Sequence, residues 1–78
     1  MKNGDIIKSF DFHNRTDCYL IGEVVGIEDD LVEFMVIKRV VENRSADTGV
    51  GILYKAPMNG HSMFDDMYPN FERIVVVG

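Results

Sequence analysis

Two clusters of polar side chains have residue types that could do chemistry. The first is His61, Asp65 and Asp66. On one helical turn His61 and Asp65 would lie four residues apart and face the same way. An imidazole beside a carboxylate can bind a divalent metal or transfer protons, but a metal site needs at least a third ligand, and none follows at a suitable spacing. The sequence therefore predicts a solvated loop with no metal and no cofactor; His61 and Asp65 are the pair that would hold a metal if one bound.

The second cluster is His13, Asp17 and Cys18. A nearby imidazole can keep a cysteine sulfur as the thiolate that acts as a nucleophile. Cys18, however, leads directly into the apolar run Tyr-Leu-Ile-Gly, and free cysteine is among the residues most often buried. A catalytic cysteine would also need an oxyanion hole and a cleft, which a chain of 78 residues can hardly enclose. We therefore predict that Cys18 is structural and that the protein is not an enzyme.

The charge balance argues against nucleic acid as a partner. The chain has 13 Asp and Glu against 8 Lys and Arg, a net charge of −5, whereas binding to phosphates normally requires a basic patch. Lys38, Arg39 and Arg44 could form a small basic face. The alternation of side chains along a strand, however, puts Lys38 and Arg39 on opposite sides.

The single cysteine and the N-terminus bear on the compartment. Cys18 is the only cysteine, so neither an intrachain disulfide nor a cysteine-based zinc site is expected. The beginning of the chain lacks the apolar core of a signal peptide, and no apolar run approaches the roughly 20 residues needed to cross a bilayer. The expectation is a cytoplasmic protein that does not contact a membrane.

The stretch from residue 18 to residue 42 is the element around which these groups are placed. Two β-rich runs, residues 18–27 and 31–42, flank the acidic corner Glu28-Asp29-Asp30. β-branched and aromatic residues favour strands and Asp favours turns, so the stretch is predicted to be a long β-hairpin. Gly22 and Gly26 in its first arm predict bulges or a close approach of another backbone, and hence a strongly coiled sheet.

Shorter elements surround the hairpin. Residues 4–10, 50–56 and 71–77 are predicted strands, and residues 43–49 have the composition of a loop. Residues 62–68 are predicted to form one turn of helix, which Ser62 caps and Pro69 ends.

The Gly4-Asp5 entry, the long bent hairpin and the ending SMFDDMYPNFERIVVV together resemble the SH3-like barrel. The resemblance covers nearly the whole chain. It implies an all-β fold, a small five-stranded SH3-like barrel with one short helical turn before the last strand, as a single domain over residues 1–78. The phrases GDIIKSFDF and DCYLIGEVVGI are also similar to small uncharacterised proteins of marine phages and environmental sequences, a likeness that implies no activity. Peptide-binding SH3 domains usually carry a tryptophan in their groove, and this chain has none, so recognition of proline motifs is not expected.

The second arm of the hairpin has apolar residues on both faces. Alternation puts Val32, Phe34, Val36 and Val40 on one face and Leu31, Met35, Ile37 and Val41 on the other. A strand with two apolar faces is bent between two sheets or covered on its outside. Met35, Ile37 and Val41 are therefore predicted to be buried between copies of the chain, by edge pairing or by sheet stacking.

Aromatic residues and methionines gather late in the chain. Most of them are expected to form a lid over the open end of the barrel. Tyr54, Met63 and Tyr68 are those expected to be left exposed, where they would bind a partner, since exposed apolar patches usually mark contact sites.

These observations predict a non-enzymatic β-barrel interaction module that acts through protein–protein contacts or self-assembly, as a homo-oligomer with an unidentified protein partner. The alternative is a nucleic-acid-associated barrel, for which fold analogy is the only argument; its binding would depend on Lys38, Arg39 and Arg44. An enzyme ranks third, because it would need His61, Asp65 or Asp66 to bind a metal.

Overall fold

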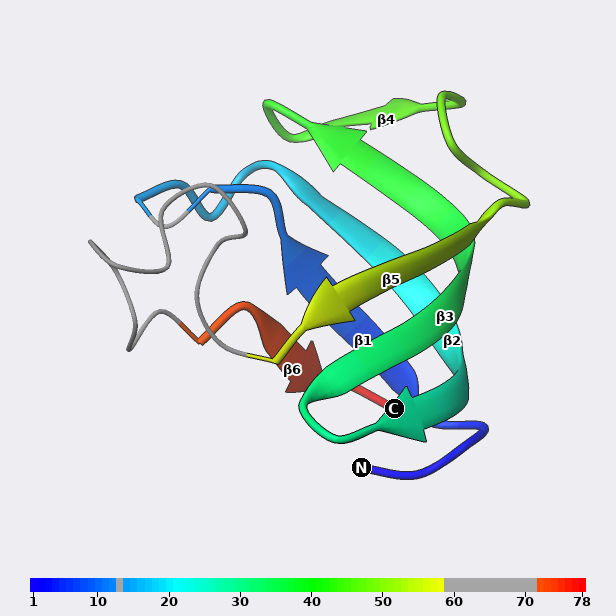
Figure 1. The fold of residues 1–78 in the computed structure, drawn as a ribbon. Helices are drawn as coiled ribbons and strands as arrows, with labels where there is room; N and C mark the ends of the chain where they lie inside the picture. Colours follow the sequence, from blue (N-terminus) through cyan, green and yellow to red (C-terminus); the bar gives the residue numbers. More distant parts are fainter. Residues whose placement is uncertain (13, 59–71) are drawn as a thin grey trace.

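The computed structural model describes residues 1–12, 14–58 and 72–78, and in this part of the chain all regular structure is β (Figure 1). The predicted all-β fold class is thereby confirmed. Six strands form one antiparallel sheet. They are β1 (Ile6–Phe10), β2 (Tyr19–Glu28), β3 (Leu31–Val41), β4 (Arg44–Ala46), β5 (Leu53–Pro57) and β6 (Ile74–Val76).

The sheet is organised around β3. The strand order is β4-β3-β2-β1-β6, and β5 pairs with β3 outside this path. β3 has 11 residues, which is long enough for two partners along one edge: residues 39–41 pair with β4, and residues 31–35 pair with β5. Its other edge pairs with β2 along almost the whole length.

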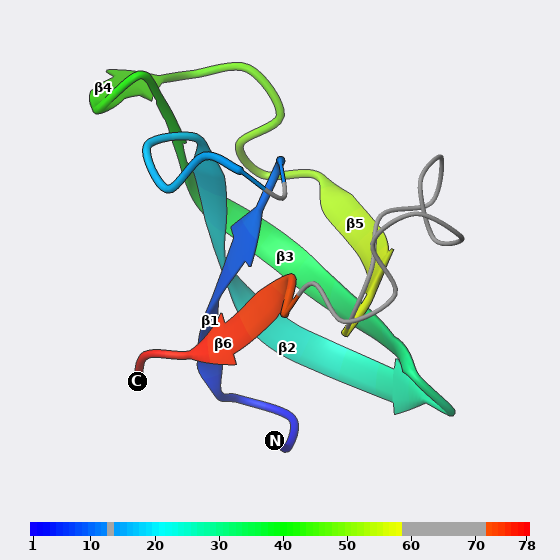
Figure 2. The ribbon, with the colours of Figure 1, turned by 90° about the vertical axis from the view of Figure 1, so that its left-hand side faces the viewer.

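The sheet curls until β5 and β6 meet. Arg73 and Ile74, where β6 begins, both donate backbone hydrogen bonds to the carbonyl oxygen of Met58, just beyond β5, at 3.0 and 3.2 Å. Figure 2 shows the result: β2 and β3 are strongly twisted, with β1, β5 and β6 arranged around them. The inner face of the sheet therefore encloses a core.

The core is formed by this inner face. Val32, Phe34 and Val36 of β3 are at most 1% exposed and belong to the buried cluster, which confirms the face predicted for them. Val40, predicted on the same face, is 4% exposed, but it follows the bulge at Ile37, lies opposite Tyr19 and is not part of that cluster. The buried cluster as a whole consists of Ile7, Leu20, Val24, Val32, Phe34, Val36, Ala56 and Ile74.

Two bulges bend the β2–β3 hairpin. The pairing passes from Ile21 opposite Lys38 to Gly22 opposite Val36, so Ile37 is an extra residue on β3. In the same way Val25 is an extra residue on β2, directly before Gly26. A bulge increases the local twist, and two of them in one hairpin explain its coiling.

Gly22 is needed because the chain is crowded beside it. A Cβ atom at this position would overlap Cδ2 of the buried Phe34 and would lie 2.9 Å from the carbonyl oxygen of Met35. The close approach predicted from this glycine is therefore confirmed.

One strand differs from the sequence prediction. Residues 43–49 were expected to be a loop, but Arg44–Ala46 forms β4, which makes the sheet six-stranded and not five-stranded. Val41 lies opposite Arg44, so Glu42 and Asn43 form a two-residue turn, with φ values of 51° and 64°. Two positive φ values are typical of the tight type I′ hairpin turn, whose usual signal is Asn-Gly or Asp-Gly. This turn was not predicted because Glu42 occupies its first position, where Asn or Asp is the usual signal.

The other strands lie where the sequence predicted them, but some of them differ from the prediction in length. The two arms of the hairpin begin and end within one residue of their predicted bounds, whereas β5 starts three residues later than predicted and β6 is confined to Ile74–Val76. The helical turn predicted for residues 62–68 lies outside the described residues.

Candidate interaction surface on the outer face of β3 and β5

The side of the sheet opposite the core is called here the outer face, and its centre is apolar. Met35 of β3 lies directly opposite Leu53 of β5 in the antiparallel register. Leu53 is 51% exposed, and Ile37, the bulged residue two positions after Met35, is also 51% exposed. Large apolar side chains from two adjacent strands thus lie open to solvent at neighbouring positions.

Further exposed apolar residues precede β5. Val36 donates a backbone hydrogen bond to the carbonyl oxygen of Ile52 (3.1 Å), and Gly51 donates one to that of Val36 (2.7 Å). These bonds keep the segment before β5 against β3. Ile52 and Val50 are 57% and 43% exposed. Ile52, however, lies beside the core residue Val36, and alternation along the strand puts it on the side of Tyr54 and not on that of Leu53.

Charged side chains border this apolar surface at both ends. Lys38 lies opposite Ile21, and Lys8 lies opposite Ile21 on its other side, so one row of the sheet carries two lysines. Two residues before Met35, Glu33 lies between Gly26 of β2 and Lys55 of β5.

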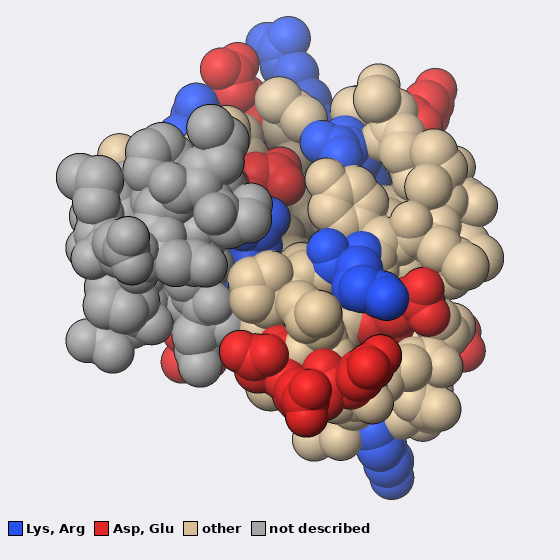
Figure 3. All heavy atoms as spheres, in the orientation of Figure 1, with Lys and Arg blue, Asp and Glu red and all other residues tan. Residues whose placement is uncertain are grey.

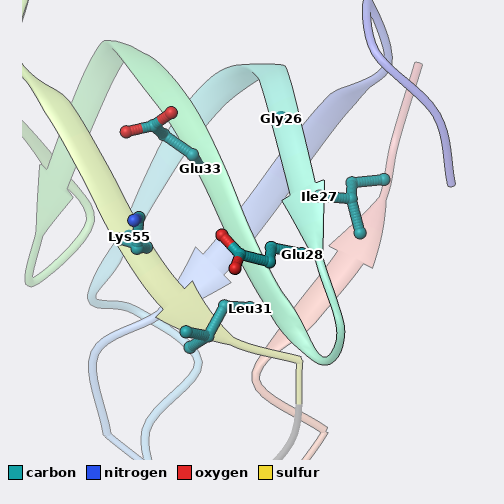
Figure 4. A pocket seen from close by; sticks show the side chains of 6 residues that line it. All are labelled: Gly26, Ile27, Glu28, Leu31, Glu33 and Lys55. Atoms are coloured by element: carbon teal, nitrogen blue, oxygen red, sulfur yellow. The ribbon is translucent and has the colours of Figure 1, made fainter.

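The acidic end is hollowed. Gly26, Ile27, Glu28, Leu31, Glu33 and Lys55 line a shallow pocket there. Figure 4 shows the side chains of Glu28, Glu33 and Lys55 directed to one side of the hairpin and that of Ile27 to the other. Figure 3 shows acidic side chains gathered over the β2–β3 turn at the lower edge of the molecule, next to a mainly uncharged area.

The structure brings two of the three predicted interface residues together. Met35 and Ile37 both belong to the outer face, whereas Val41 is the last residue of β3 and lies opposite Arg44, beyond the bulge and away from β5. Leu53 received no role from the sequence. Its contribution depends on the pairing of β5 with β3, which no local pattern in the chain reports.

Tyr54 is exposed, as predicted, although its ring also packs on the core; its binding role stays a prediction. It pairs with Phe34, and the two rings lie 5.9 Å apart with an interplanar angle of 31°. Tyr54 therefore covers one side of the core with part of its ring and remains 40% exposed. The other two predicted binding residues, Met63 and Tyr68, lie outside the described residues.

The structure describes two residues of the cysteine cluster, Asp17 and Cys18. Cys18 is 2% exposed, which confirms the predicted burial, and His13 lies outside the described residues. Arg15 donates hydrogen bonds to both carboxylate oxygens of Asp17, from Nε at 3.0 Å and from Nη2 at 2.8 Å. This hydrogen-bonded pair lowers the pKa of Asp17 and raises the pKa of Arg15.

No metal site and no membrane-spanning helix occur among the described residues. They contain no group of three His, Cys, Asp or Glu side chains placed to hold a metal ion. Within the same residues no helix is long and apolar enough to cross a membrane. His61, Asp65 and Asp66 lie outside them.

The three basic residues of the nucleic-acid alternative do not converge. Lys38 and Arg44 are exposed, whereas Arg39 is partly buried, with Nη1 3.9 Å from Oδ2 of Asp11. Lys8 instead lies over an aromatic ring, with Nζ 4.3 Å from the ring centre of Tyr19.

Comparison of the chain with protein-family models, with curated proteins and with solved structures finds no match.

Proposed function

We propose that the protein is a non-enzymatic interaction module that works through protein–protein contacts, and that it associates first with further copies of itself. The observation that supports this is the apolar centre of the outer face, where the exposed Ile37 and Leu53 lie beside the half-buried Met35. Soluble proteins rarely leave such residues grouped on their surface unless another molecule covers them.

The distribution of exposed apolar side chains supports the same proposal. Four large apolar residues of the described chain are more than half exposed: Ile52 at 57%, Val77 at 53%, and Leu53 and Ile37 at 51% each. Two of these four, Ile37 and Leu53, belong to the outer face of β3 and β5.

The test is the oligomeric state of the Ile37→Lys variant. A lysine at this half-exposed position can point into solvent in the monomer, but in the assembly it would place a charge in the apolar centre of the contact. We expect an oligomeric wild type and a monomeric variant, measured by sedimentation velocity and native mass spectrometry, with unchanged far-UV circular dichroism.

Val77→Lys is the matched control. Val77 is 53% exposed, close to the value for Ile37, but it follows β6 at the other limit of the sheet and donates a backbone hydrogen bond to Ile6. This variant should assemble like the wild type. A wild type that is monomeric at every concentration, or an Ile37→Lys variant that still assembles, would contradict the proposal.

A further inference from the structure

We propose that two copies stack outer face on outer face around a two-fold axis that lies between the sheets and crosses β3 at right angles, so that Lys38 of each copy lies against Glu33 of the other. This inference rests on the proposed function and defines its geometry. It follows from the order of charges along β3.

The outer face of β3 carries an acidic residue, an apolar centre and a basic residue in that order. Glu33 and Met35 lie opposite Lys55 and Leu53 of β5, on the side away from the core. Ile37 and Lys38, which follow, are both exposed. The strand is therefore negative at one end of its outer side and positive at the other.

The bulge at Ile37 is what places Lys38 on this side. In a regular strand Lys38 would share the face of Phe34 and Val36, which point into the core. Because Ile37 is an extra residue, Lys38 lies opposite Ile21 while Val36 lies opposite Gly22. The bulge thus exposes two consecutive side chains, one apolar and one basic, next to Met35.

Residues on neighbouring strands extend both charged ends. Lys8 lies in the same row as Lys38, across Ile21. At the acidic end Glu28 lines the same pocket as Glu33, and Gly26 contributes no side chain that would fill it. Lys55 is the one basic side chain at this end, and no ion pair within 4.0 Å joins it to Glu28 or Glu33 among the described residues.

This charge order distinguishes the two ways in which identical faces can stack by two-fold symmetry. An axis along β3 would keep the strands parallel and place Lys38 over the partner's Lys38 and Glu33 over the partner's Glu33. An axis across β3 makes the strands antiparallel and pairs each Lys38 with the Glu33 of the other copy. The apolar centres of the two copies, formed by Met35 and Ile37, then pack against each other. Opposed like charges cost binding free energy, so the antiparallel stack is favoured. Stacked sheets lie about 10 Å apart, a gap that Lys and Glu side chains together can span.

Charge reversal followed by mixing tests this geometry. In the proposed stack Glu33→Lys places two lysines against each other at both symmetric contacts, and Lys38→Glu places two carboxylates there. Each single variant should dissociate at least about tenfold more readily than the wild type, as a difference of about 1.4 kcal/mol would produce, and added salt should reduce the difference. In an equimolar mixture of the two variants, a mixed dimer brings the two introduced side chains together at one contact and the two native ones at the other. Both contacts then join a lysine to a glutamate, so the mixed dimer should form in preference to either homodimer.

Lys2→Glu and Glu72→Lys make the same charge changes at exposed positions outside the six strands. They should assemble like the wild type and gain nothing from mixing. Native mass spectrometry resolves the mixed dimer by mass, and circular dichroism confirms that each variant is folded.

The outcomes separate this inference from the proposed function. If Ile37→Lys is monomeric but the charge variants assemble like the wild type and do not prefer each other, the outer face is the contact and the antiparallel stack is wrong; edge pairing through β5 is then the arrangement to examine. If the wild type does not self-associate, both proposals fail.

Discussion

On one face of β3, Val32, Phe34 and Val36 are at most 1% exposed, whereas on the other face Leu31 and Ile37 are 40% and 51% exposed. The side chains on the two faces are similar in type. What differs is the covering: β1, β2, β5 and β6 curl around the inner face, while none of the described strands lies over the outer one.

This difference shows that the apolar pattern of a strand and its burial are separate properties. Burying a Val, Leu or Ile side chain stabilises a protein by about 1.5–3 kcal/mol relative to leaving it exposed. The inner face gains this stabilisation when the chain folds. The outer face can gain a comparable amount per side chain only when a second molecule covers it, and this is the physical basis of the proposed self-association.

The strongest test of the comparison replaces one residue on each face. Phe34→Ala removes a fully buried ring from the core and should lower the free energy of unfolding by about 4 kcal/mol. Ile37→Ala, measured at a concentration where the protein is monomeric, should change it by less than about 0.5 kcal/mol. Urea denaturation followed by circular dichroism measures both. If the two variants lost similar amounts of unfolding free energy, the outer face would have to be covered within the monomer.

Phe34→Leu is a second variant in case Phe34→Ala does not fold, since it retains most of the buried volume and should lose less stability.

The reactivity of the Cys18 thiol is an independent measure of how often the core opens. This residue is 2% exposed, so labelling of its thiol should require opening of the structure and should accelerate in the Phe34 variants but not in Ile37→Ala.

Gly22→Ala should have the next largest effect, because it tests the bend that separates the two faces. The added methyl group would overlap the Phe34 ring and press on the Met35 carbonyl oxygen, and overpacking of this kind costs about 1–3 kcal/mol. Combining it with Phe34→Ala should cost less than the sum of the two single losses, because alanine lacks the Cγ and Cδ2 atoms that the added methyl group would meet. Strictly additive losses in a double-mutant cycle would show that Gly22 and Phe34 do not interact.

The sequence was sufficient for those parts of the fold that depend on local chemistry. The β-rich arms, the acidic turn and the alternation on β3 predicted the hairpin and its buried face. β4 was missed because its turn uses Glu42 at a positive φ value, where Gly, Asn or Asp is the usual signal. The resemblance to SH3-like barrels stays a prediction, since no comparison bears on it.

The candidate site could be predicted only in part, for a physical reason. Met35 and Ile37 follow from the two-faced pattern of one strand. Leu53 joins them through pairing between strands that are distant in the sequence, and Lys38 joins them through the bulge. Register and bulges are set by contacts between strands, which a pattern within a single strand does not contain.

The exposed ion pair between Arg15 and Asp17 should give the smallest effect, and its pH dependence has a definite sign. The hydrogen bonds from Arg15 lower the pKa of Asp17 in the folded protein. A carboxyl group whose pKa is lowered by folding stabilises the folded state above its unfolded pKa, and this contribution disappears as the pH falls through the folded pKa. Asp17→Asn should therefore reduce stability slightly at neutral pH, and the difference from the wild type should vanish in acid, once Asp17 is protonated in both states.

Because both partners of this ion pair are exposed, solvent and salt screen it. The difference between Asp17→Asn and the wild type at neutral pH should therefore shrink with added salt, whereas the loss caused by Phe34→Ala should not. Arg15→Gln is the control, since it removes the other partner and should abolish the effect of Asp17→Asn in a double-mutant cycle. Thermal unfolding monitored across the acidic range measures all three variants. A difference that grew with acidification would reverse the sign derived from the pKa of Asp17 and would show that its carboxylate destabilises the fold.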